Sequence, residues 1–453
     1  MAIHRVLVGN RGEIAVRVIR ACADEELDTV VALSAADMDS LPAYLADRAV
    51  CVGPASPAES YLDVDRMLAA AVTTGCDALH PGYGFLSERP ELASACEEHG
   101  VVFVGPSERI IRRGGDKVVA RELARQLGVP VGAGSESVRS GQEAAAVAAR
   151  IGYPILLKAA AGGGGKGMVL VHGPAEVVGR FESASFQALQ AFGDERVYIE
   201  RYIGNARHVE VQILGDRAGN VIHLGERDCS YQRRYQKLLE EGPASDLSPR
   251  LRAGLHEAAV TLARELKYVG AGTIEFVVDL DRESFSFLEI NTRVQVEHPV
   301  TEMITGVDIV REQLRIAGGQ TLDVRQEDVA LRGHAIECRI NAEAAREGFR
   351  PDPGRLERWV TPQSSHVRVD THCYPGYLVP PYYDSLLAKL IAWGEDRAEA
   401  TRRMGHALAH LRVEGVATTA PFHQAVIRHP DFAARRVNTR WVEEVFIPEW
   451  TAA

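Results

Sequence analysis

The sequence predicts an α/β protein of several domains that begins with a parallel, doubly wound sheet. Its 453 residues are too many for a single hydrophobic core and suggest two to four domains. Near the N-terminus, short apolar runs alternate with an amphipathic helical pattern, which is typical of a parallel β/α sheet. Farther along, alternating segments separated by short polar turns predict antiparallel hairpins.

Composition limits the classes of function. An apolar share of 46% and a charged share of 25% are those of an ordinary soluble protein. A net charge of −11 disfavours a nucleic-acid surface, so an anionic substrate needs local basic residues. The N-terminal apolar run is too short for a signal sequence and no span reaches membrane length, so we expect a cytosolic protein without membrane contact. Seven cysteines without CxxC spacing predict reduced thiols.

The N-terminal third predicts the parallel sheet. A strand at residues 5–8 leads through a glycine turn into a helix at 14–22. Gly9 and Gly12 match only part of a dinucleotide fingerprint, because the third glycine is missing, so NAD binding is disfavoured. Further strands are expected at 29–33, 49–52, 78–79 and 101–104.

A loop at residues 80–88 follows the fourth expected strand. Two glycines flank Tyr83 in this loop, and glycine permits the tight turn that would present the tyrosine ring. A structural and a functional role are equally open from this pattern alone.

Residues 128–135 resemble a linker, and a helix at 142–150 and a strand at 154–159 follow. Four glycines and Lys166 then precede a strand at 168–171. This segment resembles a P-loop only superficially, because Lys166 is followed by glycine and a strand comes next. Backbone N–H groups of such a glycine hairpin can close over phosphates, although a merely floppy hairpin is the alternative.

The next segments combine hairpins with basic residues. A strand at 196–203 could place Glu200 beside a nucleotide base. Strands at 207–214 and 220–226 predict a hairpin. Residues 227–237 are dense in basic and polar side chains, which fits polyphosphate binding better than a solvated loop.

Residues 289–297 alternate polar and apolar side chains, which in extended backbone separates them onto two faces. A hairpin of 273–279 with 285–291 would place Glu275 directly opposite Glu289. Facing carboxylates repel each other, and a hard divalent cation would turn that repulsion into ligation, with Asn291 as a third oxygen ligand. The alternative is the solvated face of a surface strand.

After residue 320 the apolar pattern restarts with a strand at 332–341 that carries Arg339. Apolar segments at 367–370, 374–381 and 383–392 and a helix at 398–411 follow. These elements suggest a small mixed α/β domain.

Five motifs in this order resemble the biotin carboxylases of the ATP-grasp superfamily, from about residue 3 to about residue 445. The resemblance implies an N-terminal Rossmann-like (preATP-grasp) domain at 1–113, an ATP-grasp domain at 114–320 with a lid at about 131–203, and a C-terminal domain at 332–445. The motifs are His80-Pro-Gly-Tyr-Gly-Phe-Leu-Ser-Glu88, Gly162-Gly-Gly-Gly-Lys-Gly-Met168, Arg227-Asp-Cys-Ser-x-Gln-Arg-Arg234, Glu289-x-Asn-x-Arg-x-Gln-Val-Glu-His-Pro299 and Arg332-Gly-His-Ala-Ile-Glu-Cys-Arg339.

The resemblance also implies a reaction and a set of site residues. The reaction is ATP-dependent carboxylation of biotin by bicarbonate through carboxyphosphate. Catalysis would rest on Glu297 as general base with Arg293, Arg339 and Lys237. Residues expected to contact ATP are Lys117, Lys158, Gly163, Gly164, Gly165, Lys166, Gly167, Met168, Glu200, Ile203, His208, Gln232, Tyr235, Lys237, Glu275 and Glu289. Mg²⁺ or Mn²⁺ would bind Glu275, Glu289 and Asn291, bicarbonate would bind Lys237, Arg293, Gln295, Val296 and Glu297, and biotin would bind Tyr83 and Arg339.

One position departs from the family pattern. Tyr235 stands where a histidine is often found near the nucleotide ribose, which puts that hydrogen bond in doubt. No lysine between methionines, the mark of a biotinyl domain, occurs in the sequence. We therefore expect a biotin carboxyl carrier protein and a carboxyltransferase on other chains, as in acyl-CoA carboxylases, and a homodimer. The alternatives are another ATP-grasp ligase, acting on an amine, and a silent nucleotide-binding subunit.

Overall fold

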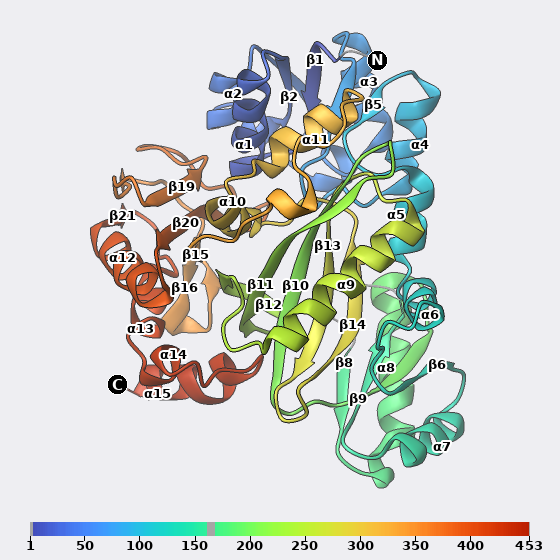
Figure 1. Cartoon of the computed structure of the whole chain (residues 1–453). Helices are drawn as coiled ribbons and strands as arrows, with labels where there is room; N and C mark the ends of the chain where they lie inside the picture. Colours follow the sequence, from blue (N-terminus) through green and yellow to red (C-terminus); the bar gives the residue numbers. More distant parts are fainter. Residues whose placement is uncertain (1–2, 161–167, 453) are drawn as a thin grey trace.

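The computed structural model describes residues 3–160 and 168–452 of the chain. Its main elements are a parallel N-terminal sheet, a small four-stranded sheet and a long antiparallel sheet (Figure 1). The α/β class expected from the sequence is confirmed. Among these described residues, no helix is both long enough and apolar enough to span a membrane.

The N-terminal sheet has five parallel strands in the order β3-β2-β1-β4-β5, which confirms the predicted doubly wound arrangement. Val6, Leu7 and Val8 are all fully buried, because helices cover both faces of a parallel sheet and its strands become continuous apolar runs. The elements are β1 (Arg5–Val8), α1 (Gly12–Asp24), β2 (Asp28–Ser34), α2 (Leu41–Leu45), β3 (Arg48–Gly53), α3 (Val64–Thr73), β4 (Ala78–His80), α4 (Pro90–Glu98), β5 (Val102–Phe103) and α5 (Glu108–Gly115).

A four-stranded antiparallel sheet in the order β6-β9-β7-β8 lies at one end of the molecule (Figure 1). The helix and the two strands expected at 142–171 are confirmed, whereas part of the expected linker is strand β6. Gly163 to Gly167, expected to contact ATP, lie outside the described residues. The elements are α6 (Lys117–Gln126), β6 (Gly134–Val138), α7 (Gly141–Ile151), β7 (Ile155–Ala159), β8 (Met168–Val171), α8 (Val177–Phe192) and β9 (Val197–Arg201).

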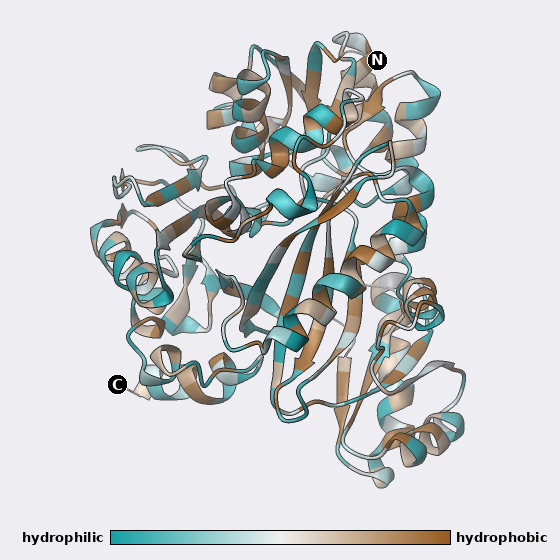
Figure 2. Ribbon diagram, in the orientation of Figure 1, coloured by the Kyte–Doolittle hydropathy of each residue, from teal (hydrophilic) through white to brown (hydrophobic). Residues whose placement is uncertain are grey.

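The long sheet has eight antiparallel strands in the order β14-β13-β10-β11-β12-β15-β20-β19. Helix α9 packs on β10 and β11 through Leu255 and Leu262, which lie on one face of the helix. Figure 2 shows hydrophilic and hydrophobic bands alternating along these strands. The elements are β10 (Ala206–Gly215), β11 (Val221–Arg233), β12 (Gln236–Gly242), α9 (Pro249–Leu266), β13 (Gly270–Asp279), β14 (Ser284–Asn291), α10 (His298–Thr305) and α11 (Ile309–Ala317).

The last part of the chain extends this sheet. Strand β15 pairs with β12, with Leu239 opposite Cys338. One sheet therefore contains strands from both of the domains expected on either side of residues 320–332. The domain limits themselves stay predictions. The elements are β15 (His334–Asn341), β16 (Glu343–Ala344), β17 (Arg350–Pro351), β18 (Arg358–Val360), β19 (Val367–Thr371), β20 (Leu386–Gly394), α12 (Arg397–His410), β21 (Arg412–Glu414), α13 (Ala420–Val426), α14 (Pro430–Ala433) and α15 (Ile447–Ala452).

Candidate active site

A cavity of about 710 Å³ lies where the three sheets meet. Side chains from the N-terminal part, the four-stranded sheet and the C-terminal strands all line it. Every expected site residue that the structure describes lies in its wall: Tyr83, Lys117, Lys158, Met168, Glu200, Ile203, His208, Gln232, Tyr235, Lys237, Glu275, Glu289, Asn291, Arg293, Gln295, Val296, Glu297 and Arg339.

The acidic pair on β13 and β14 has the predicted register, with Glu275 directly opposite Glu289. Asn291 Nδ2 donates to Glu275 Oε1 at 2.9 Å, and Lys117 Nζ lies 2.8 Å from Glu289 Oε2. Two carboxylates and an amide at one place are a suitable oxygen donor set for Mg²⁺ or Mn²⁺. The residues present therefore fit the expected metal.

Lys237 is the centre of a second acidic group. Its Nζ lies 2.5 Å from Glu210, 3.0 Å from Glu275 and 2.6 Å from Glu297. Burial alone would lower the pKa of this lysine, but the surrounding negative charge raises it well above its usual range. The lysine is therefore a permanent cation that holds three carboxylates together.

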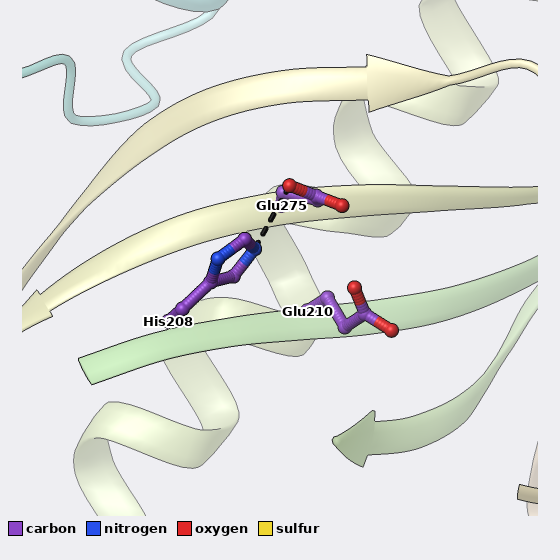
Figure 3. A group of neighbouring side chains, drawn as sticks. All are labelled: His208, Glu210 and Glu275. Atoms are coloured by element: carbon purple, nitrogen blue, oxygen red, sulfur yellow. Dashed lines mark ion pairs between the residues drawn. The ribbon is translucent and has the colours of Figure 1, made fainter. Parts of the chain in front are cut away.

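His208, Glu210 and Glu275 also lie close enough to hold a metal ion (Figure 3). His208 Nε2 is 2.8 Å from Glu275 Oε2, and this carboxylate raises the pKa of the imidazole although burial opposes it. Lys237 also contacts Glu210 and Glu275, so these carboxylates share two basic neighbours.

Glu297 is fully buried between two cations. Lys237 Nζ is 2.6 Å from its Oε1, and Arg339 Nη2 is 2.9 Å from its Oε2. Burial would raise the pKa of this carboxyl, but the two cations hold it well below its usual range. While both cations contact it, Glu297 is therefore a weak base.

The segment between β14 and α10 leaves the sheet after Asn291. Arg293 donates to Glu88 at 2.8 Å and to Gln295 Oε1 at 2.9 Å. The carbonyl of Val296 accepts from Lys389 Nζ at 2.9 Å. These contacts fix a short irregular segment that presents a guanidinium and an amide to the cavity.

Tyr83 lines the cavity from the loop after β4. Gly82 and Gly84 have φ of 61° and 66°, so the predicted tight turn is confirmed. The tyrosine hydroxyl donates to Glu13, whose other oxygen is 3.0 Å from Lys389. One buried lysine thus connects the tyrosine loop with the carbonyl of Val296.

At the other end of the cavity, Glu200 forms ion pairs with Lys158 and Arg121. Although burial raises the pKa of this carboxyl, the two cations lower it below its usual value. Gln232 lies 2.7 Å from His208 Nδ1. The predicted role of Glu200 beside a base stays a prediction.

The basic segment at 227–237 is not a solvated loop, and only some of its side chains face the cavity. It forms β11, β12 and a two-residue turn in which Arg234 and Tyr235 have φ of 49° and 62°. Arg227 is fully buried and donates to Glu210 at 2.6 Å. This arginine supports the sheet, whereas Lys237 faces the site.

Four charged residues of the site were missed by the sequence analysis: Glu13, Glu210, Glu240 and Lys389. Glu210 was detectable, because it shares a strand face with His208 in the predicted strand. Lys389 was also detectable, because it is a charged residue in an otherwise apolar segment. The importance of Glu13 and Glu240 depends on contacts between distant segments, and no local pattern reveals it.

Three family models match the chain: "Biotin carboxylase, N-terminal domain" at residues 2–111, "Carbamoyl-phosphate synthase L chain, ATP binding domain" at 116–325 and "Biotin carboxylase C-terminal domain" at 337–444. The chain is 48% identical to biotin carboxylase 1 of Bacillus subtilis, over 97% of this chain and 98% of the relative. It is 50% identical to biotin carboxylase of a Nostoc species, over 98% of this chain and 100% of the relative.

The structure is similar to that of the biotin carboxylase domain dimer of 2-oxoglutarate carboxylase from Hydrogenobacter thermophilus, which was solved with MgADP, ADP and bicarbonate. The TM-score is 0.94 at 44% identity, and 98% of each chain is covered. The likeness therefore extends over almost the whole of both chains.

Proposed function

The chain belongs to the biotin carboxylase family, and we propose that the cavity around Glu297 is where it performs the reaction of this family. It is an ATP-dependent ligase that carboxylates N1′ of biotin with bicarbonate and leaves ADP and phosphate. This is the first half-reaction of a biotin-dependent carboxylase. The roles given below to single residues are our proposals.

One observation carries the assignment of the site. The buried carboxylate of Glu297 is shared between Lys237 and Arg339, while the Glu275–Glu289 pair lies on the neighbouring strands. A base, two cations and a metal-binding pair in one cavity match a reaction that deprotonates an anion and transfers a phosphoryl group to it. An amine ligase does not require Arg339 beside the base.

We propose that ATP binds between the four-stranded sheet and the acidic pair. Lys117 and Lys158 would contact its phosphates, and Glu275, Glu289 and Asn291 would hold Mg²⁺ or Mn²⁺. When bound, the metal neutralises charge on the phosphate oxygens and favours their transfer. Residues proposed to contact the rest of the nucleotide are Glu200, Ile203, His208, Gln232 and Tyr235, all of which line the cavity.

Bicarbonate would bind Arg293, Gln295 and the backbone of Val296, beside Lys237. Glu297 would remove its proton, although this carboxyl is a weak base while both cations contact it. Anionic substrates attract the same cations, which would leave the buried carboxylate less well paired. Its pKa would then rise, and it would become a base only when the site is filled.

Biotin would bind between Tyr83 and Arg339. Carboxyphosphate would split into CO₂ and phosphate, and the phosphate would take the N1′ proton. The guanidinium would stabilise the enolate oxygen as charge develops there, and N1′ would then attack CO₂. Arg339 must exchange its contact with Glu297 for one with biotin when biotin binds. The same exchange would free Glu297, so one arginine would couple the biotin site with the bicarbonate site.

The partners are also a proposal. We propose a homodimer that receives biotin on a carrier protein and passes it to a carboxyltransferase, both on other chains. An acyl-CoA is the acceptor that we propose. The solved relative belongs to a 2-oxoglutarate carboxylase, and the choice of acceptor belongs to the carboxyltransferase.

The test is ATP hydrolysis by the purified protein with and without bicarbonate and free biotin. We expect hydrolysis that requires bicarbonate and increases with biotin. Hydrolysis that requires an amine instead would identify another ATP-grasp ligase. Nucleotide binding without turnover would identify a silent subunit.

A further inference from the structure

Two fully buried carboxyl groups, Glu240 and Glu337, have no part in the mechanism above. They lie directly opposite each other in the antiparallel pair of β12 and β15. Side chains in such a pair are neighbours, and two negative charges there repel each other strongly in a dry interior. The pair therefore needs a proton or a cation.

One oxygen of Glu240 is hydrogen-bonded to a described residue, whereas its other oxygen and both oxygens of Glu337 are not. Arg339 donates to Glu240 Oε1 from Nε at 2.6 Å and lies 2.5 Å from the same atom through Nη2. Within the described parts of the chain, Glu240 Oε2 and both oxygens of Glu337 have no hydrogen-bond partner. A neutral Glu337 supplies the O–H donor that Glu240 Oε2 needs.

No cation among the described residues forms an ion pair with Glu337, because the nearby lysine, Lys389, contacts Glu13 and the carbonyl of Val296 instead. On β20, the residue opposite Glu337 is the apolar Ile391. An ionised Glu337 would therefore be a buried charge without an ion-pair partner among the described residues, which is costly.

We propose that Glu337 is a neutral carboxylic acid that donates a hydrogen bond to Glu240, and that this pair positions Arg339 for biotin. Glu337 is a positioning residue and does not touch substrate. It holds Glu240, Glu240 holds one edge of the guanidinium, and the remaining N–H groups are then directed toward Glu297 and the cavity. This inference rests on the proposed role of Arg339.

The direction of the pKa shifts agrees with the geometry. Burial raises the pKa of Glu337 well above its usual range, and Glu240 raises it further. Burial also raises the pKa of Glu240 to about 7, although Arg339 opposes the shift. The charged or titratable groups that face the pair from the surrounding strands and the start of α10 are Arg339, Lys389, Lys237, Cys229 and Glu297.

Infrared spectroscopy tests the protonation directly and does not depend on the reaction. At pH 8, surface carboxyl groups are ionised, so the carbonyl stretch of a protonated carboxylic acid should come from buried groups. We expect this band in the wild-type protein and its loss in Glu337→Gln. An unchanged spectrum would overturn the proposal and would favour a cation between the two carboxylates.

Turnover tests the positioning. Wild-type protein must first show bicarbonate-dependent ATP hydrolysis stimulated by biotin, and failure there would refute the proposed function, not this inference. In Glu337→Leu the donor is lost, and we expect biotin carboxylation per ATP hydrolysed to fall about tenfold. In Glu337→Gln the amide N–H replaces the donor, and we expect the ratio to recover to within about twofold.

Two results would overturn the positioning role: a normal ratio in Glu337→Leu, or a Gln variant as defective as the Leu variant. If Glu337→Leu fails to fold, the infrared and turnover results for Glu337→Gln still decide between a neutral donor and an ionised group.

Discussion

The two large sheets of this protein bury different kinds of side chain. The parallel N-terminal sheet has an apolar interior, in which Leu7 and Val30 are fully buried. The eight-stranded sheet buries Arg227, Glu240 and Lys389 just as completely. A buried charge is costly unless it is paired. The described strands of the parallel sheet bury no Asp, Glu, Lys or Arg, so the paired charges of the eight-stranded sheet indicate that function resides there.

The largest effect should be seen in catalysis, at the edge of the eight-stranded sheet. Glu297→Gln removes the proposed base while keeping its size, and we expect kcat to fall about 10³-fold with little change in the KM for ATP. Steady-state kinetics measures both constants, and Glu98→Gln on the surface of α4 is the matched control. A change confined to the KM for ATP would contradict a role as base.

One substitution in each sheet should lower stability by a similar amount, but for different reasons. Arg227→Met removes one partner of the buried ion pair with Glu210 and should lower the free energy of unfolding by about 3 kcal/mol. Leu7→Ala in the parallel sheet should cost a similar amount, about 2–5 kcal/mol, through the cavity that it leaves.

Only the first of these two variants should also impair turnover, since Glu210 contacts Lys237. Urea unfolding and kinetics on both proteins measure the contrast. If both variants lost the same stability and the same turnover, the proposed functional difference between the two sheets would be wrong.

Acid should weaken the charged sheet selectively. Burial would raise the pKa of Asp370, but Arg368 lowers it to about 2. A depressed carboxyl pKa stabilises the fold above the unfolded value near pH 4, and this contribution is lost as the pH falls toward 2.

We therefore expect Asp370→Asn to cost about 2 kcal/mol at pH 6 and progressively less as the pH falls below 4. Urea unfolding of both proteins across this range measures the difference. A cost that does not depend on pH would show that the ionised form of Asp370 contributes nothing to stability.

The smallest effect should come from Lys389→Met, which keeps the aliphatic stem and removes the contacts with Val296 and Glu13. We expect the KM for bicarbonate to rise about tenfold, because the loss of one charged hydrogen bond costs about 1.5 kcal/mol or more. An unchanged KM with a normal response to biotin would show that this lysine only fills space.

The sequence was informative where structure is local. The register of Glu275 against Glu289 followed from the length of one turn, and the parallel sheet followed from its apolar runs. The approach of Arg339 to Lys237 and Glu297 could not be derived in this way. It depends on the pairing of β12 with β15, about a hundred residues apart in the chain, and only the family resemblance placed these residues in one site.

We propose that the eight-stranded sheet positions Arg339 for biotin, whereas Glu297 acts on bicarbonate. The most direct measurement is the amount of carboxybiotin formed per ATP hydrolysed by Arg339→Ala, compared with wild type. We predict that bicarbonate-dependent hydrolysis survives in large part while the yield of carboxybiotin falls about a hundredfold. An equal loss of both activities would contradict the separate roles of Arg339 and Glu297.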